Sequence, residues 1–208
     1  MTYAPFIGNA FGEARLLVVS ESAFSWLEQG ELRHPPESHP SDTIEHVIEH
    51  FNDASAFARR MTMALTGKRE PSADERRKAW NGYAYTIYVQ ETVGDAARQR
   101  PVREMYDRAK KPFLELIEKL QPRRILVIGL DAWRHMPDAH VYLVRDLQAY
   151  RLNSGGLAWC MAIGHTAGSE WPGWETLHDA MTLFRNLDLP GSENGENHLG
   201  SDGQGSGR

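Results

Sequence analysis

Four runs of consecutive apolar residues recur along the chain, and each ends at a turn that carries polar residues or glycine. They occupy residues 15–19, 83–89, 124–128 and 157–163. The apolar residues in each run are continuous rather than alternating, which is typical of strands buried on both faces of a parallel sheet. A weaker run at 141–144 indicates an extra or edge strand.

Helical patterns separate these runs. Asp42 and Glu45 form a capping-box pattern ahead of a helix whose apolar positions continue at helical spacing to Ala58. Ser72 and Glu75 repeat the capping-box pattern before a helix that runs through residue 80. Two more helices are predicted, from residue 101 to a stop at 122 and from about 174 to 187.

Strands that alternate with helices imply βαβ units and a sheet covered on both sides, so the fold class expected is α/β. Residues 1–189 are expected to form a single domain. Residues 22–40 are expected to form a long loop with a function. Residues 190–208 are rich in glycine and serine, which predicts a disordered tail.

Composition excludes several classes of protein. No apolar run approaches the roughly 20 residues of a membrane span, and the first residues lack a secretory pattern. Cys160 is the one cysteine, which excludes an internal disulfide and a cysteine-ligated zinc or iron–sulfur site. We therefore expect a cytoplasmic protein with no membrane partner, no metal and no cofactor.

The charge is distributed unevenly. The whole chain has a formal net charge of −5, but residues 59–124 contain sixteen lysines and arginines against nine acidic residues, a balance of +7. This basic segment has two interpretations: it contacts phosphates, or its arginines and lysines are solvated faces of helices.

Ligands of open parallel sheets bind at the carboxyl ends of the strands, which makes the residues after each run candidates for a site. These residues are Ser20, Glu21, Ser22, Gln90, Glu91, Asp131, His165, Thr166 and Ser169. A carboxylate after the first strand and a histidine after the fourth suit water activation and charge stabilisation. The alternative for each residue is that it only caps a helix.

Four blocks of the sequence resemble the uracil-DNA glycosylase superfamily, and in particular its divergent bacterial members. They are VVSES at 18–22, the 85–90 strand with RQRPVREM at 98–105, KLQPRRILVIG at 119–129 with Ala132 and Trp133, and GHTAGS at 164–169. The resemblance implies a three-layer α/β/α sandwich with a central, mainly parallel four-stranded sheet. It also implies DNA repair chemistry, in which the N-glycosidic bond to a damaged or deaminated base is hydrolysed.

The resemblance also assigns roles to residues. Glu21 or Ser22 would orient the attacking water, and His165 would stabilise the leaving base. Candidates for contact with the base or ligand are Ser20, Phe24, Thr86, Ile87, Gln90, Ser169 and Trp171, of which Phe24 would stack on the base. Candidates for contact with the DNA backbone are Arg98, Arg100 and Arg103.

The chain departs from the family motifs at several positions. Ser22 replaces an aspartate of one family motif, so water activation would fall to Glu21, and Ala23 and Thr166 replace prolines. Three functions therefore remain open: a DNA glycosylase, an inactive relative that binds nucleotides or nucleic acid, and a small-molecule hydrolase with Glu21 and His165 as its polar pair.

Overall fold

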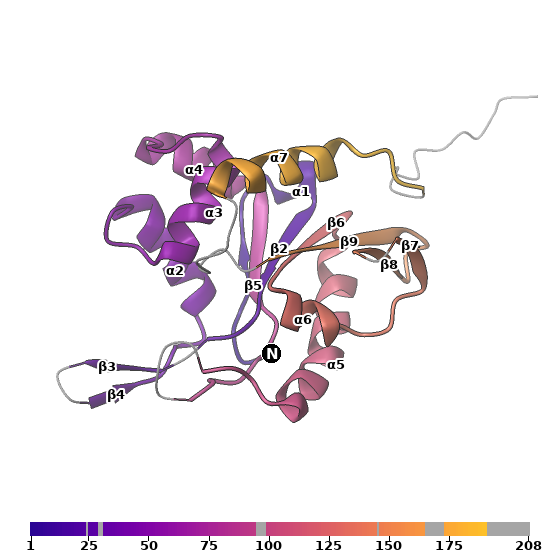
Figure 1. The fold of residues 1–208 in the computed structure, drawn as a ribbon, viewed down its shortest axis with the longest axis horizontal. Helices are drawn as coiled ribbons and strands as arrows, with labels where there is room; N and C mark the ends of the chain where they lie inside the picture. The colour runs from indigo at the N-terminus through magenta and orange to yellow at the C-terminus, as the bar shows by residue number, and fades with distance from the viewer. Residues whose placement is uncertain (24, 29–30, 95–98, 145, 165–172, 191–208) are drawn as a thin grey trace, which may run out of the picture.

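The computed structural model describes residues 1–190 except positions 24, 29–30, 95–98, 145 and 165–172, and its centre is a seven-stranded mixed sheet (Figure 1). The strands in spatial order are β1 (Phe6–Ile7), β5 (Tyr83–Ile87), β2 (Leu16–Ser20), β6 (Arg124–Ile128), β9 (Leu157–Ile163), β8 (Leu147–Arg151) and β7 (Val141–Val144).

The four predicted runs form the middle of this sheet. β5, β2, β6 and β9 are parallel neighbours, which confirms an α/β protein with a parallel core. The sheet is larger than the four strands expected, because β1, β8 and β7 extend it with antiparallel pairings. β7 coincides with the weak run at 141–144, whereas β8 was not predicted, since Gln148 and Arg151 interrupt its apolar pattern.

Helices cover both faces of the sheet, and this explains the continuous apolar runs. Alternate residues of β2 pack on opposite sides: Leu16 and Val18 belong to one hydrophobic cluster, and Leu17 and Val19 to the other. All five residues of β2 are buried. A strand between two helical layers requires apolar side chains at every position.

The helices in the described part of the chain divide between these two faces. They are α1 (Phe11–Ala14), α2 (His39–Glu49), α3 (Ala56–Thr66), α4 (Ala73–Asn81), α5 (Arg103–Leu120), α6 (Leu130–Arg134) and α7 (Gly173–Asn186). α5 and α6 pack on the face of Leu17, and α2, α3, α4 and α7 pack on the face of Leu16. None of these helices has the length and apolar character needed to span a bilayer.

The helix predicted from Asp42 through Ala58 is in fact two helices. α2 begins three residues earlier, at His39, where Pro40 fits the first turn, and the Ser38 hydroxyl donates to Asp42 Oδ2 over 2.8 Å. The chain then leaves the helix at residue 50. α3 restarts with Ser55 as its N-cap, whose Oγ accepts from the Ala58 N–H. The apolar spacing continued across this break and concealed it.

Other predicted elements are confirmed. The capping box of Ser72 and Glu75 is present at the start of α4, with both reciprocal hydrogen bonds. α5 begins at Arg103 and ends at Leu120, and α7 lies within one residue of its predicted bounds.

The expected loop over 22–40 contains regular structure. β3 (Trp26–Glu28) and β4 (Glu31–Arg33) form an antiparallel hairpin that projects away from the main sheet (Figure 1). The first residues of α2 also fall within it. The tail predicted to be disordered lies, from residue 191 onward, outside the described residues.

Arg76 joins three parts of the helical layer from a buried position. Its side chain, 8% exposed, donates from Nε to the Ile48 carbonyl over 2.8 Å and from Nη1 to the Pro71 carbonyl over 2.5 Å. Its guanidinium also lies 5.2 Å from the centre of the Phe51 ring. The buried guanidinium is tolerated here because backbone carbonyl oxygens accept its hydrogen bonds.

We expect Arg76→Gln to lower the free energy of unfolding by about 2 kcal/mol, because charge-assisted hydrogen bonds to buried carbonyls are lost. Arg77→Gln is the matched control, since Arg77 forms an exposed ion pair with Glu49 and such pairs contribute little. Urea unfolding followed by circular dichroism measures both variants. Equal destabilisation of the two would contradict the structural role given to Arg76.

Candidate functional site

The parallel pairing brings the ends of β5, β2, β6 and β9 to one edge of the sheet, called the carboxyl edge below. Ser20, Ile87 and Ile128 are partners in the ladder, and Ile163 pairs with Ile128. The chain passes from β2 to β5 on one side and later to β6 and β9 on the other side. The loops after β2 and β6 therefore diverge, and this change of direction is where open α/β sheets bind ligands.

Glu21 is the first residue after β2 and lies at this point of divergence, half-buried. Its carboxylate atom Oε1 accepts a hydrogen bond of 2.7 Å from the hydroxyl of Tyr106. Tyr106 belongs to the buried stripe of α5, whose first turns lie at the carboxyl edge, and its side chain is only 3% exposed. A rigid, buried donor thus fixes one oxygen of a partly exposed carboxylate.

His135 lies on the other side of Tyr106. The two rings are stacked, with centroids 4.2 Å apart and planes 8° from parallel. His135 Nδ1 is 2.8 Å from the Asp131 carbonyl oxygen, which can only accept, so Nδ1 carries a proton and donates. Gly129 allows the sharp entry into α6 that places His135 here, because its φ of 121° disfavours any residue with a Cβ.

Burial and the neighbouring charge of Glu21 shape the acidity of Tyr106. Desolvation by burial raises the pKa of the Tyr106 phenol well above its usual value, and the hydrogen bond and charge of Glu21 raise it further. The phenol therefore stays protonated at neutral and mildly alkaline pH, and it remains a hydrogen-bond donor to Glu21.

Two ion clusters border the site. The Asp131 carboxylate pairs with Arg100 and with Arg134, the latter at 2.8 Å. Glu91 is held by two hydrogen bonds from Arg108, of 2.6 and 2.8 Å, which lower the pKa of the Glu91 carboxyl. Because these arginines already have acidic partners, the carboxyl edge is a mixed-charge surface.

Ser20, Glu21 and Ser22 are consecutive residues at the carboxyl end of β2. The Ser20 hydroxyl is 2.9 Å from the Tyr85 hydroxyl. The Gln90 side chain is buried and bonds to the backbone at both polar atoms: its Oε1 accepts from the Tyr3 N–H, and its Nε2 donates to the Ile87 carbonyl.

Thr86 and Ile87, the predicted base-reading positions, are buried within the strand. Ile87 is 2% exposed and packs in the cluster with α2 and α3. Thr86 is 1% exposed, and its Oγ1 has no hydrogen-bond partner. Six other predicted residues lie outside the described part of the chain, namely Phe24, Arg98, His165, Thr166, Ser169 and Trp171.

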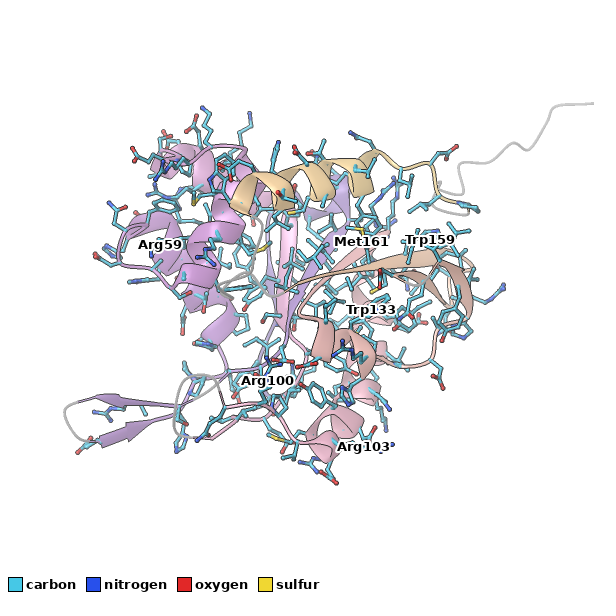
Figure 2. All side chains as sticks on the ribbon, in the orientation of Figure 1. Arg59, Arg100, Arg103, Trp133, Trp159 and Met161 are labelled. Atoms are coloured by element: carbon cyan, nitrogen blue, oxygen red, sulfur yellow. The ribbon has the colours of Figure 1, made fainter. Side chains whose placement is uncertain are left out.

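Described arginines of the basic segment lie in separate regions of the molecule. Figure 2 shows Arg59 beside the α2–α3 region, whereas Arg100 and Arg103 lie near the start of α5 at the carboxyl edge. Arg103 is strongly exposed, and its guanidinium lies 3.9 Å from the Asp107 carboxylate. Together with the buried role of Arg76, this division leaves only part of the basic segment beside the candidate site.

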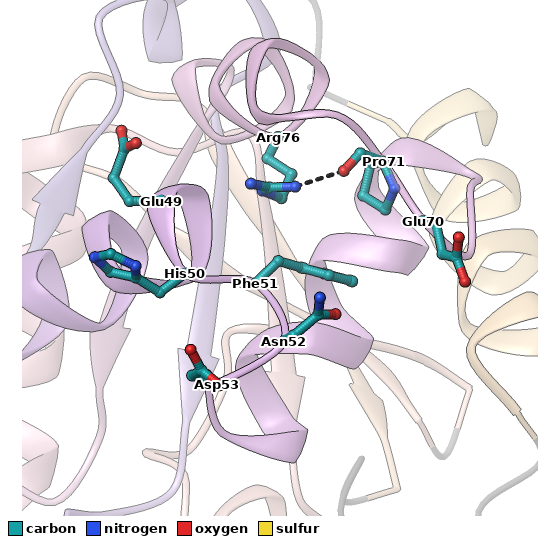
Figure 3. Close-up of a pocket in the computed structure, with 8 residues that line it drawn as sticks. All are labelled: Glu49, His50, Phe51, Asn52, Asp53, Glu70, Pro71 and Arg76. Atoms are coloured by element: carbon teal, nitrogen blue, oxygen red, sulfur yellow. Dashed lines mark hydrogen bonds between the residues drawn. The ribbon is translucent and has the colours of Figure 1, made fainter.

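Two surface cavities lie away from the carboxyl edge. One, of about 470 Å³, is lined by the end of α2 and the approach to α4, where Arg76 donates to Pro71 (Figure 3). The other, of about 500 Å³, includes Gly82 and Tyr83 at the opposite edge of the sheet. Within the described ranges, no three histidine, cysteine, aspartate or glutamate side chains are grouped so as to bind a metal ion.

Comparison with known proteins identifies no family for this chain. No protein-family model and no curated protein matches the sequence. The proposed function therefore rests on the residues and their geometry.

Sequence reasoning missed Tyr106, the hydrogen-bond partner of Glu21, and His135, whose ring stacks on Tyr106. Tyr106 is 85 positions from Glu21, and its only sequence signal is its place on the buried stripe of a helix that begins at the carboxyl edge. His135 follows a five-residue helix that no strong periodicity marks. Both become visible only when β2, α5 and α6 are placed together.

We expect Thr86→Val to leave the free energy of unfolding unchanged or to raise it by up to about 1 kcal/mol, because it removes a buried hydroxyl without a partner. Thr62→Val is the matched control: Thr62 Oγ1 donates to the Ala58 carbonyl and accepts from Trp80 Nε1. That variant should lose about 1–3 kcal/mol. Chemical unfolding of both variants tests the contrast, and a loss at Thr86 equal to that at Thr62 would contradict it.

Proposed function

We propose that this protein is a hydrolase of the uracil-DNA glycosylase type. It would cleave the N-glycosidic bond between a base and its sugar in DNA or in a nucleotide-like ligand. Support comes from the four sequence blocks that resemble this superfamily. Their strands are adjacent and parallel, so the residues after β2, β5, β6 and β9 leave the sheet at one edge.

The observation that carries the proposal is the placement of Glu21. A half-buried carboxylate at the divergence point of the sheet, held by Tyr106 through Oε1, suits the task of orienting a water molecule with its other oxygen. In the proposed reaction the water oxygen bonds to C1′ while the bond from C1′ to the base nitrogen breaks. Glu21 accepts a proton from the water, and the base leaves with the bonding electron pair.

The leaving base would carry negative charge until it is protonated. By the resemblance, His165 would stabilise that charge from the loop after β9. The products are a free base and a sugar with a hydroxyl at C1′. No metal or redox partner is needed to balance this reaction.

A second candidate is a hydrolase of a free nucleoside or another small molecule at the same site. The division of the basic segment favours it, because duplex binders gain much of their affinity from neutralising many phosphates. Arg76 is used internally, and Arg59 lies away from Arg100 and Arg103. A short ligand needs fewer phosphate contacts than a duplex does.

A base-release assay tests both candidates. Labelled single- and double-stranded oligonucleotides that contain uracil, hypoxanthine, xanthine or mismatched thymine are incubated with the protein, beside the corresponding free nucleosides. We expect Glu21→Gln to lower the rate by at least about 100-fold, because the amide cannot accept the proton of the water. His165→Ala is run in parallel as the test of the second predicted group.

Glu115→Gln serves as the matched control, because Glu115 is an exposed carboxylate of α5 whose partner is Lys111. It should keep the wild-type rate. Release of base from nucleosides alone would favour the second candidate. Intact substrates in every reaction, or full activity of Glu21→Gln, would overturn the proposed function.

A further inference from the structure

The hydroxyl of Tyr106 is the contact that ties the candidate site to the protein core. Glu21 lies on a loop, where its carboxylate could rotate, whereas Tyr106 is buried in α5. The 2.7 Å hydrogen bond joins the two across 85 positions of sequence. A carboxylate that activates water must present its oxygen in a fixed direction, and misplacement by a fraction of an ångström is costly.

We propose that Tyr106 is a positioning residue for the hydrolysis, which holds Glu21 Oε1 so that Oε2 is directed at the attacking water. This inference rests on the proposed function. Tyr106 lies outside the four blocks that carry the resemblance, so the resemblance gives it no role.

A tyrosine suits this role for two reasons. Its hydroxyl is a neutral donor, so it orients the carboxylate without the full charge neutralisation that an arginine or lysine partner would impose. It also stays protonated, because burial and Glu21 raise the pKa of its phenol. The charged groups that act on the phenol are Glu21, which raises this pKa, and Arg100, which lowers it.

The ring of Tyr106 is itself held in place. The His135 ring stacks on it at 4.2 Å, and the Tyr88 ring lies beside it, tilted by 32°, with the centroids 6.5 Å apart. His135 is fixed in turn by its Nδ1–H bond to the Asp131 carbonyl, and the Tyr88 hydroxyl donates to the His135 carbonyl over 2.9 Å. His135 therefore acts through Tyr106: its ring stacks on the tyrosine ring and keeps the hydroxyl directed at Glu21.

Tyr106→Phe removes the hydroxyl and keeps the ring. We expect kcat for base release to fall by about 10- to 100-fold with KM changed by less than about twofold, because the lost contact orients the water activator rather than the ligand. Tyr150→Phe is the matched control, since Tyr150 is also a buried tyrosine of this layer and its hydroxyl donates to the Pro137 carbonyl. It should keep the wild-type kcat.

Variants of His135 separate stacking from other roles. His135→Ala removes the stacked ring and should lower kcat, as Tyr106→Phe does. His135→Phe restores a flat ring and should recover part of that loss, since aromatic stacking does not need the imidazole nitrogens, although the Nδ1–H bond to the Asp131 carbonyl is lost. Wild-type kcat in His135→Ala would overturn the role given to the stack.

An NMR measurement tests the hydrogen bond without any activity. In protein labelled at the tyrosine ring carbon that bears the hydroxyl, each phenol gives a signal at neutral pH, and Tyr106→Phe assigns the signal of Tyr106. Glu21→Gln should shift this signal, because a neutral amide replaces the charged acceptor of the Tyr106 hydroxyl. An unchanged Tyr106 signal would overturn the inference.

The failures of the two proposals are distinguishable. Wild-type protein that releases no base from any substrate overturns the proposed function, and with it the role of Tyr106. Active wild-type protein with an equally active Tyr106→Phe overturns the role of Tyr106 alone.

Discussion

The pairing of β2 with a parallel strand on each side is the constraint on which the rest of the structure depends. Hydrogen bonds to β5 and β6 engage both edges of β2, and helical layers cover both of its faces. All five residues of β2 are buried, so an unpaired charged group along this strand would be costly. Glu21 is the first residue after this buried strand, and its carboxylate is partly exposed to solvent at the carboxyl edge.

The helices that pack on one face of the sheet, α5 and α6, also supply the residues that hold Glu21. α5 contributes Tyr106 from the same buried stripe that carries Phe113 and Ile117, so packing of the helix also fixes the donor to Glu21. α6 contributes His135 through a turn that only Gly129 readily adopts. Stability and site geometry are therefore coupled: a cavity made under α5 would displace the hydroxyl that holds Glu21.

Local signals explain what the sequence predicts correctly. The buried strands are read from runs such as 16–20 and 124–128, and the start of α4 from Ser72 and Glu75, because both depend on neighbours in the chain. The break between α2 and α3 is hidden, since the apolar spacing continues through it.

β8 was missed for another reason. It has Gln148 at a buried position, where the side chain donates to the Tyr150 hydroxyl, and this partner satisfies a group that the sequence pattern counts as polar. The pairing of Glu21 with Tyr106 is invisible in the sequence, because it depends on how α5 docks on the sheet. Sequence patterns therefore located the edge that carries the candidate site but not the contacts that orient it.

The most direct test of the central claim follows the oxygen of the attacking water. The reaction is run in water enriched in oxygen-18, and the released base is analysed by mass spectrometry. Attack of water at C1′ predicts that the base leaves without the label, whereas attack of water on the base would place the label in it. Label in the base, or no base released at all, would contradict the account.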